Sequence, residues 1–115
     1  MKMLKNLREL NTSTTALVLL GVLDQALEPM YGYQISKYVE ANFKDTPIMK
    51  QSVLYPVLRT LEKNGLLESK VEPSVSGPPR RYYKITDDGR ETLKIWRKTW
   101  DRTKEFLDAI LQGGE

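Results

Sequence analysis

The segment LLESKVEPSVSGPPRRYYKIT, residues 66–86, is the most informative part of this chain for predicting its fold. Residues 66–72 and 81–86 each have the length and the mixture of apolar and polar side chains that are typical of a short strand. Residues 73–80 between them contain three prolines, two serines and a glycine, which are residues that favour turns. The stretch therefore predicts two antiparallel strands joined by a long hairpin loop.

Helical patterns precede this hairpin. Residues 15–27 are apolar on most sides and follow the capping cluster Asn11-Thr12-Ser13-Thr14, so they predict a largely buried helix that Pro29 ends. Residues 31–43 carry apolar side chains at a spacing of four residues, which predicts a second helix. Ahead of both helices, the first ten residues form a short amphipathic segment whose leucines are Leu4, Leu7 and Leu10.

A third helix is predicted over residues 52–64. Its apolar stripe consists of Leu54, Leu58 and Leu61. Gly65 follows, at the position where a residue in the left-handed conformation often ends a helix. With Ser52 as the N-cap, Pro56 would remove one early hydrogen bond, so we expect some distortion near the start of this helix.

A long helix is predicted after the hairpin, over residues 88–111. Thr86-Asp87-Asp88 offers a cap and acidic side chains for the positive end of its dipole. Three helices, a two-stranded ribbon and a long helix predict an α+β winged helix-turn-helix, whose third helix enters a major groove. We expect residues 1–87 to form the DNA-binding part and residues 88–112 a C-terminal dimerisation helix, together making one compact unit.

Composition excludes several classes of protein. The 115 residues have room for little more than one domain, and they include neither cysteine nor histidine. Because the commonest general base and the commonest metal ligands are missing, we expect no enzyme, no metal and no cofactor. The longest apolar stretch, residues 16–23, is far shorter than the roughly 20 residues of a membrane span. Without a signal-peptide pattern, the chain is expected to be cytoplasmic and free of membrane contact.

Basic side chains are concentrated in one third of the chain. Seven lysines and arginines stand against three glutamates between Lys50 and Lys84, whereas the net charge of the whole chain is +3. Such concentration favours a polyanionic partner, although it is also found on solvated basic faces.

Eight residues of this region are candidates for contact with double-stranded DNA: Lys50, Gln51, Ser52, Tyr55, Arg59, Arg80, Arg81 and Lys84. The first three lie at a helix N-terminus, where backbone N–H groups and the dipole favour a phosphate. Tyr55 and Arg59 lie opposite the leucine stripe, where they can face bases or phosphates. Arg80 and Arg81 follow Pro78-Pro79, which stiffens the loop and holds both guanidinium groups forward.

Three motifs in this order give the chain a specific resemblance. They are YGY (31–33), LYPVL with LEKNGL (54–66), and GPPRRYYKITDDG (77–89). Together they resemble the PadR family of bacterial transcriptional regulators over about residues 17–111. The single final helix and the short chain resemble the small PadR-like subgroup that includes multidrug-sensing repressors. Many members carry Ser-Pro where this chain has Lys50-Gln51, and Arg where it has Pro78, so the resemblance implies no operator sequence.

The final helix carries a second functional pattern. Its apolar seam at alternating spacings of three and four consists of Leu93, Trp96, Trp100, Thr103, Leu107 and Ile110. A seam that protrudes from a small domain predicts a homodimer, which would place two recognition helices on a palindromic operator. Packing of this helix on its own domain is the alternative, and the N-terminal leucine segment could also cover part of the seam.

Trp96 and Trp100 lie one helical turn apart on this seam. They can serve as interface core, or they can form a flat slot for a planar hydrophobic effector. The resemblance implies an effector-binding aromatic at the position of Trp100. The expected function is thus a homodimeric DNA-binding regulator, a repressor, that responds to a hydrophobic small molecule. The alternative is a winged-helix module that binds proteins and not DNA.

Overall fold

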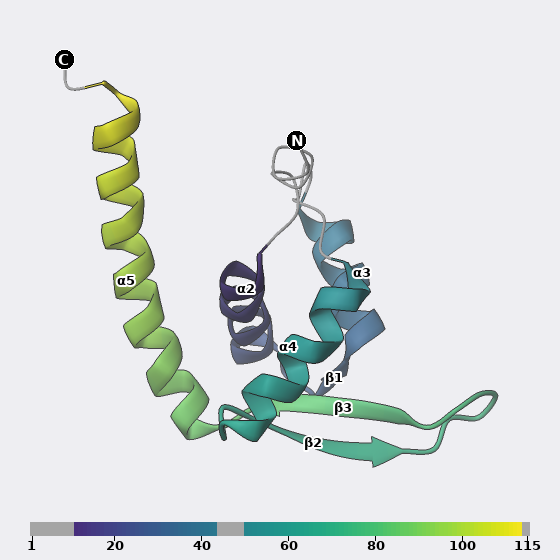
Figure 1. Cartoon of the computed structure of the whole chain (residues 1–115). Helices are drawn as coiled ribbons and strands as arrows, with labels where there is room; N and C mark the ends of the chain where they lie inside the picture. The colour runs from purple at the N-terminus through teal and green to yellow at the C-terminus, as the bar shows by residue number, and fades with distance from the viewer. Residues whose placement is uncertain (1–10, 44–49, 114–115) are drawn as a thin grey trace.

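The computed structural model describes residues 11–43 and 50–113 of the chain. Its elements are α2 (Thr12–Gln25), β1 (Met30–Tyr31), α3 (Gly32–Asn42), α4 (Gln51–Lys63), β2 (Leu67–Glu72), β3 (Arg80–Ile85) and α5 (Asp87–Leu111). Figure 1 shows α2, α3 and α4 gathered over the sheet, with the β2–β3 hairpin reaching out on one side and α5 rising on the other. The predicted order of helices and hairpin strands and the α+β class are therefore confirmed. The predicted amphipathic segment with Leu4, Leu7 and Leu10 lies outside the described residues.

The sheet has one strand more than the sequence predicted. Within the described residues the strand order is β1-β3-β2, and both pairings are antiparallel. β1 pairs Met30 with Tyr83 and Tyr31 with Tyr82. The predicted two-stranded ribbon is confirmed by the pairing of β2 with β3. β1 was not predicted, because a strand of two residues is too short to show an alternating pattern.

α4 begins earlier than predicted. Lys50, and not Ser52, is the N-cap, and Pro56 consequently lies in the second turn of the helix. Proline has no N–H to donate to the carbonyl four residues before it, which belongs to Ser52. Ser52 is exposed, so water can hydrate that carbonyl and the helix continues through the proline.

The core lies where α2 and α4 meet the sheet. Its fully buried large side chains are Leu19, Leu20, Ile35, Leu54, Leu58 and Leu67. Gly32 allows α3 and α4 to pack closely, because a Cβ at this position would collide with the ring of Tyr55. Gly65 has the predicted left-handed conformation, with φ of 78° after the end of α4. The core thereby fixes the orientation of α4 relative to the sheet.

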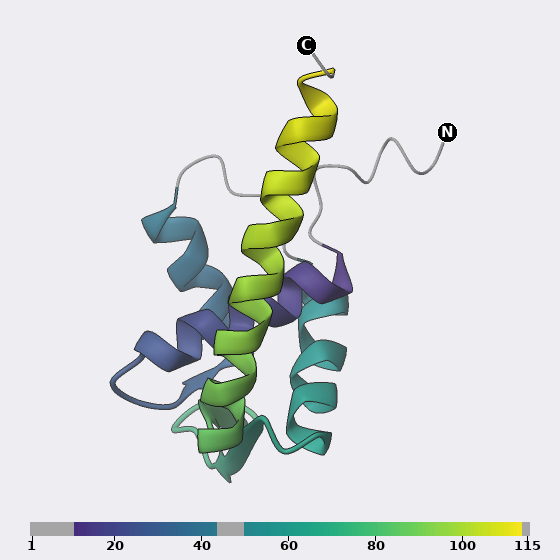
Figure 2. The same cartoon turned by 90° about the vertical axis from the view of Figure 1, so that its left-hand side faces the viewer.

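α5 is joined to the domain at its first turns and stands free at its end. Thr86 caps it by accepting a hydrogen bond from the Gly89 N–H, and the Thr86 hydroxyl donates to the Gly65 carbonyl. Gly89 is buried against the Leu66 carbonyl, and a Cβ at position 89 would collide with that carbonyl oxygen. In Figure 2 α5 crosses α2 and continues past it. Among the described helices, none is long and apolar enough to cross a membrane.

Candidate nucleic-acid interface

The outer face of α4 carries a stripe of polar side chains that we call the outer stripe: Tyr55, Arg59 and Glu62. These residues share one helix face by their spacing, beside the buried stripe of Leu54, Leu58 and Leu61 and about 100° from it around the helix. Tyr55 is 37% exposed and packs its ring edge against Gly32 at the start of α3. Arg59 is exposed, as the sequence predicted. The packing of Tyr55 on α3 and of the leucines in the core therefore fixes the position of the outer stripe relative to the rest of the domain.

The N-terminus of α4 is open to solvent. Lys50, Gln51 and Ser52 are all exposed, with Lys50 at the N-cap and the other two in the first turn. The first N–H groups of a helix have no partner within the helix, and they carry the positive end of its dipole. This end of α4 can therefore bind a phosphate group.

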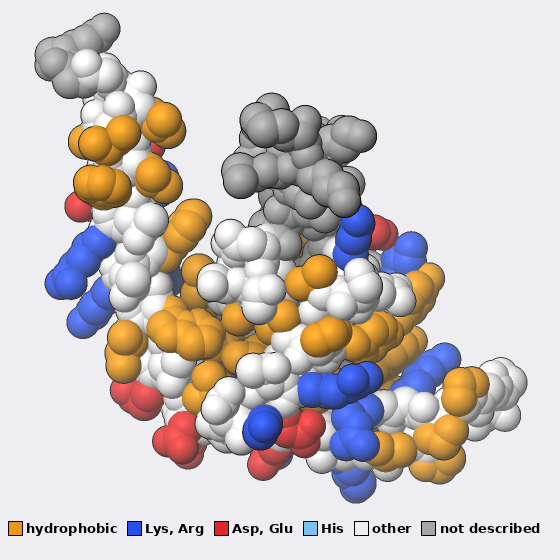
Figure 3. All heavy atoms as spheres, in the orientation of Figure 1, with side chains coloured by type: hydrophobic (Ala, Val, Ile, Leu, Met, Phe, Trp, Pro, Cys, Tyr) orange, Lys and Arg blue, Asp and Glu red, His pale blue; other side chains and the backbone are white. Residues whose placement is uncertain are grey.

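The wing, defined here as β2, residues 73–79 and β3, presents its basic side chains on two different faces. Tyr83 and Ile85 are buried against the helices, and strand alternation places Arg81 on their side of the sheet. Arg80 and Lys84 belong to the opposite face. Figure 3 shows basic side chains gathered between α4 and the hairpin. The structure brings Arg81 to the outer stripe and separates it from its sequence neighbour Arg80.

A chain of hydrogen bonds joins Arg81 to α4. The guanidinium Nη1 of Arg81 donates to the Ser69 hydroxyl at 2.9 Å, and that hydroxyl donates to the carboxylate of Glu62. Ser69 is half-buried on β2, where it is in register with Tyr83. Neither Ser69 nor Glu62 was predicted as a site residue, because only the alternation of the two strands combined with the stripe of α4 brings them together.

The Tyr83 side chain lies beneath the same contact. Burial raises the pKa of its hydroxyl, and the negative charge of Glu62 raises it further, while Arg81 and Arg59 oppose the shift. The hydroxyl therefore lies within the electrostatic reach of groups on both α4 and β3. Its ring belongs to the hydrophobic core.

On the opposite face of the sheet, two of the predicted DNA contacts have partners within the protein. The Arg80 guanidinium stacks over the Tyr31 ring at 4.6 Å from its centroid, and that ring meets Tyr82 edge to face. The Lys84 ammonium pairs with the Glu68 carboxylate at 3.0 Å, directly across the strands. The stacking contact uses the flat face of the Arg80 guanidinium, whereas the charge of Lys84 is paired with a carboxylate.

The predicted seam of α5 divides into two parts. Leu93 and Trp96 are half-buried against the domain's own core. The distal seam, defined as Trp100, Thr103, Leu107 and Ile110, is exposed. Trp100 is 44% exposed and Ile110 60%. Phe106 and Leu111 add exposed apolar surface beside it that the seam spacing did not include.

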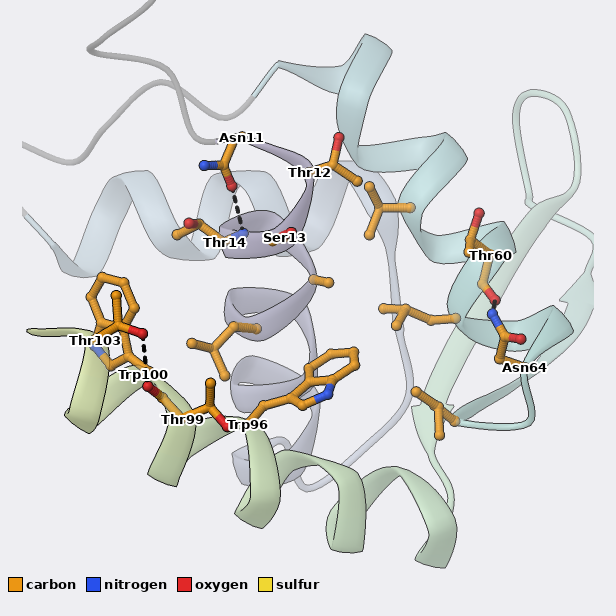
Figure 4. A pocket seen from close by; sticks show the side chains of 15 residues that line it. Asn11, Thr12, Ser13, Thr14, Thr60, Asn64, Trp96, Thr99, Trp100 and Thr103 are labelled. Carbon is orange, nitrogen blue, oxygen red and sulfur yellow. Dashed lines mark hydrogen bonds between the residues drawn. The ribbon is translucent and has the colours of Figure 1, made fainter.

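A groove of about 660 Å³ runs between α5, α4 and the start of α2. In Figure 4 the Trp96 indole reaches across it toward α4, and Trp100 lies farther along α5 beside Thr103. Hydroxyl and amide side chains at the start of α2 and the end of α4 line the other sides. None of the described residues that line the groove is charged, and two of them are tryptophans, so its chemistry suits a lipophilic aromatic molecule.

Comparison with known proteins places this geometry in a family. Residues 19–95 match the transcriptional regulator PadR-like family. A PadR family transcriptional regulator from Eggerthella lenta is 33% identical, with a TM-score of 0.72 over 97% of this chain and 91% of its own. A transcriptional regulator from Clostridium thermocellum is 28% identical, with a TM-score of 0.74 over 84% and 91% of the two chains.

An uncharacterized protein of Lysinibacillus sphaericus is 33% identical over 74% of this chain and 78% of its own. The family match spans the helix-turn-helix and the wing and ends before both tryptophans. Both the match and the arrangement of α3, α4 and the hairpin lead to one assignment: the chain belongs to the PadR-like family of DNA-binding transcriptional regulators.

Proposed function

We propose that this chain is a homodimeric, cytoplasmic transcriptional repressor that binds a palindromic operator and responds to a planar hydrophobic small molecule. The observation that carries the proposal is the juxtaposition of the outer stripe of α4 with Arg81 of the wing. A duplex that receives α4 in its major groove would meet both elements at once.

The proposed contacts fall into two classes. Tyr55 and the side chains of Gln51 and Ser52 in the first turn of α4 would face base edges, whereas Lys50, Arg59, Arg80 and Arg81 would neutralise phosphates. Arg81 lies on the α4 side of the sheet, so we rank it above Arg80. Lys84 would contribute least, because its ion pair with Glu68 lies on the opposite face.

Dimerisation is supported by the exposure of the distal seam. Apolar side chains that project from a small domain at heptad spacing favour a second copy of the same helix. A twofold arrangement would also present two copies of α4 to two half-sites.

The groove between α5 and the domain supports the effector proposal. Its volume lies within the range of small-molecule sites, and both tryptophans line it. Because Trp96 is packed on its own domain, Trp100 is the indole that could meet its symmetry mate across a dimer axis. Membership of the multidrug-sensing subgroup is part of this proposal.

The experiment that tests DNA binding is selection from a pool of random duplexes, followed by titration of the recovered sequence. We expect an inverted repeat to be enriched. Tyr55→Ala should reduce discrimination against random DNA, whereas Arg81→Ala should weaken binding to specific and random duplexes by similar factors. Arg97→Ala is the matched control, because Arg97 is an exposed arginine of α5 away from the outer stripe.

Recovery of no duplex at low salt would leave the protein-interaction module as the better explanation. Equal effects of Arg97→Ala and Arg81→Ala would show that binding does not use the wing.

A further inference from the structure

Ser69 occupies the junction of three elements. Its hydroxyl lies on β2, accepts a hydrogen bond from Arg81 of β3 and donates one to Glu62 of α4. Ser69 is half-buried, and Glu62 is half-buried on the outer stripe. The contact therefore links the recognition helix to both strands of the wing through one side chain.

The donor and acceptor capacities of the three side chains determine the direction of these hydrogen bonds. A carboxylate can only accept, so Glu62 takes the one proton that the Ser69 hydroxyl can donate. The lone pairs of the hydroxyl are then directed to the guanidinium of Arg81, which can only donate. Glu62 thereby fixes Ser69 as an acceptor for Arg81.

This arrangement has a consequence for the arginine. A free arginine side chain samples many rotamers, and ordering it on a phosphate costs conformational entropy. The bond to Ser69 uses one of the five N–H groups of Arg81 and restricts the side chain beforehand. The remaining N–H groups stay available for a phosphate.

We propose that Ser69, oriented by Glu62, is a positioning residue that holds Arg81 beside α4 in the geometry that binds DNA. The inference rests on the proposed DNA binding. It adds two residues that would themselves contact no DNA but would make the wing and α4 one preformed surface.

The test compares Ser69→Ala with Ser69→Thr in titrations of a random-sequence duplex at several salt concentrations. Ser69→Ala should weaken binding about three- to tenfold per protomer, the scale of one lost hydrogen bond. Ser69→Thr keeps a hydroxyl and should restore the affinity of the parent protein. Arg81→Ala should lower the salt slope by about 0.9 per protomer, whereas Ser69→Ala should leave the slope unchanged because the charge remains.

Double variants separate positioning from a general structural effect. Ser69→Ala should cost nothing further in the Arg81→Ala background. Glu62→Ala should cost more affinity for DNA in the parent protein than in the Ser69→Ala background. The variant removes the same negative charge in both backgrounds, so the difference between them reports the loss of the Glu62–Ser69 hydrogen bond alone. Additive losses in either pair would overturn the inference.

A measurement without DNA keeps this test separate from that of the proposed function. Nitrogen relaxation of the Arg81 side chain should show an ordered Nε–H in the parent and in Ser69→Thr, and an averaged one in Ser69→Ala. If the parent binds DNA but Ser69→Ala matches it in affinity and in Arg81 order, the positioning role is wrong and DNA binding stands. If Arg81 becomes mobile in Ser69→Ala but the parent protein binds no duplex, the proposed DNA-binding function is wrong. The role of Ser69 in DNA binding is then wrong as well, although Ser69 still orders Arg81.

Discussion

At the scale of single residues, Tyr83 connects the core with the candidate interface. Its ring is buried with the core leucines, while its hydroxyl lies within reach of the charges of Glu62, Arg81 and Arg59. Burial is the largest influence on this hydroxyl, and it disfavours the charged phenolate. The pKa of Tyr83 is therefore raised above the ordinary value near 10.

This shift predicts a stability that depends on alkaline pH. A group whose pKa is raised on folding contributes stability below its unfolded pKa of about 10, and this contribution is lost as pH rises through the folded value. Tyrosinate absorbance of the folded protein should show a titration step above the ordinary value near 10, and Tyr83→Phe should remove that step. The variant should also lose less stability between neutral and alkaline pH. An identical titration in the variant would contradict the assignment.

Arg80 and Arg81 show which features of the wing could be predicted from the sequence and which could not. Both were identified from the sequence as wing arginines, and both are exposed on β3. Adjacent residues of a strand point to opposite faces, so the pair divides between Ser69 on one side and Tyr31 on the other. The stacking of Arg80 on Tyr31 depended on β1, a strand that the sequence did not predict.

At the scale of elements, the helices were predicted with small errors at their ends. The leucine stripe of α4 and the cap of α5 are strong local patterns, and both were confirmed. The N-cap of α4 was misplaced because Ser52 is the better capping residue by type, yet the cap is Lys50, two residues earlier. The predicted seam of α5 could not be divided from sequence, since only packing against α2 shows which part is covered.

The distal seam predicts a specific effect on assembly. Leu107→Asp would place a charge in a desolvated interface between two copies, at a cost on the order of several kcal/mol. Sedimentation equilibrium should give the parent near twice the monomer mass of 13.3 kDa and the variant near that mass. Ala109→Asp introduces the same charge on the opposite face of α5 and should leave the dimer intact. A monomeric parent at micromolar concentration would contradict dimerisation through this helix.

At the scale of the whole molecule, α5 is fixed to the DNA-binding part at one end. The Arg90 guanidinium pairs with Asp24 of α2 at 3.3 Å and with Asp87 at 3.2 Å, and Gly89 packs on the Leu66 carbonyl. A change in the angle between two α5 helices would therefore move each domain with its own helix. In the proposed dimer, such a movement changes the distance between the two copies of α4.

The groove beside Trp96 and Trp100 is the place where a ligand could bias that angle. A ligand alters DNA binding only if it binds the DNA-competent and DNA-incompetent dimers with different affinity. The coupling is reciprocal, so operator DNA must weaken ligand binding by the same factor by which the ligand weakens operator binding. This equality can be measured from either side.

We expect planar, lipophilic dyes, neutral or cationic, to quench tryptophan emission saturably and to weaken operator binding. Trp100→Ala should cost about 1 kcal/mol or more of dye binding, roughly a fivefold loss in affinity, because one aromatic stacking partner is removed. Trp100→Phe keeps an aromatic face and should retain most of the affinity. Tyr38→Ala removes an exposed aromatic residue outside the groove and should have no effect. Since Trp96 remains in every variant, its emission reports binding throughout, and equal dye affinity in the parent and in Trp100→Ala would restrict the tryptophans to a structural role.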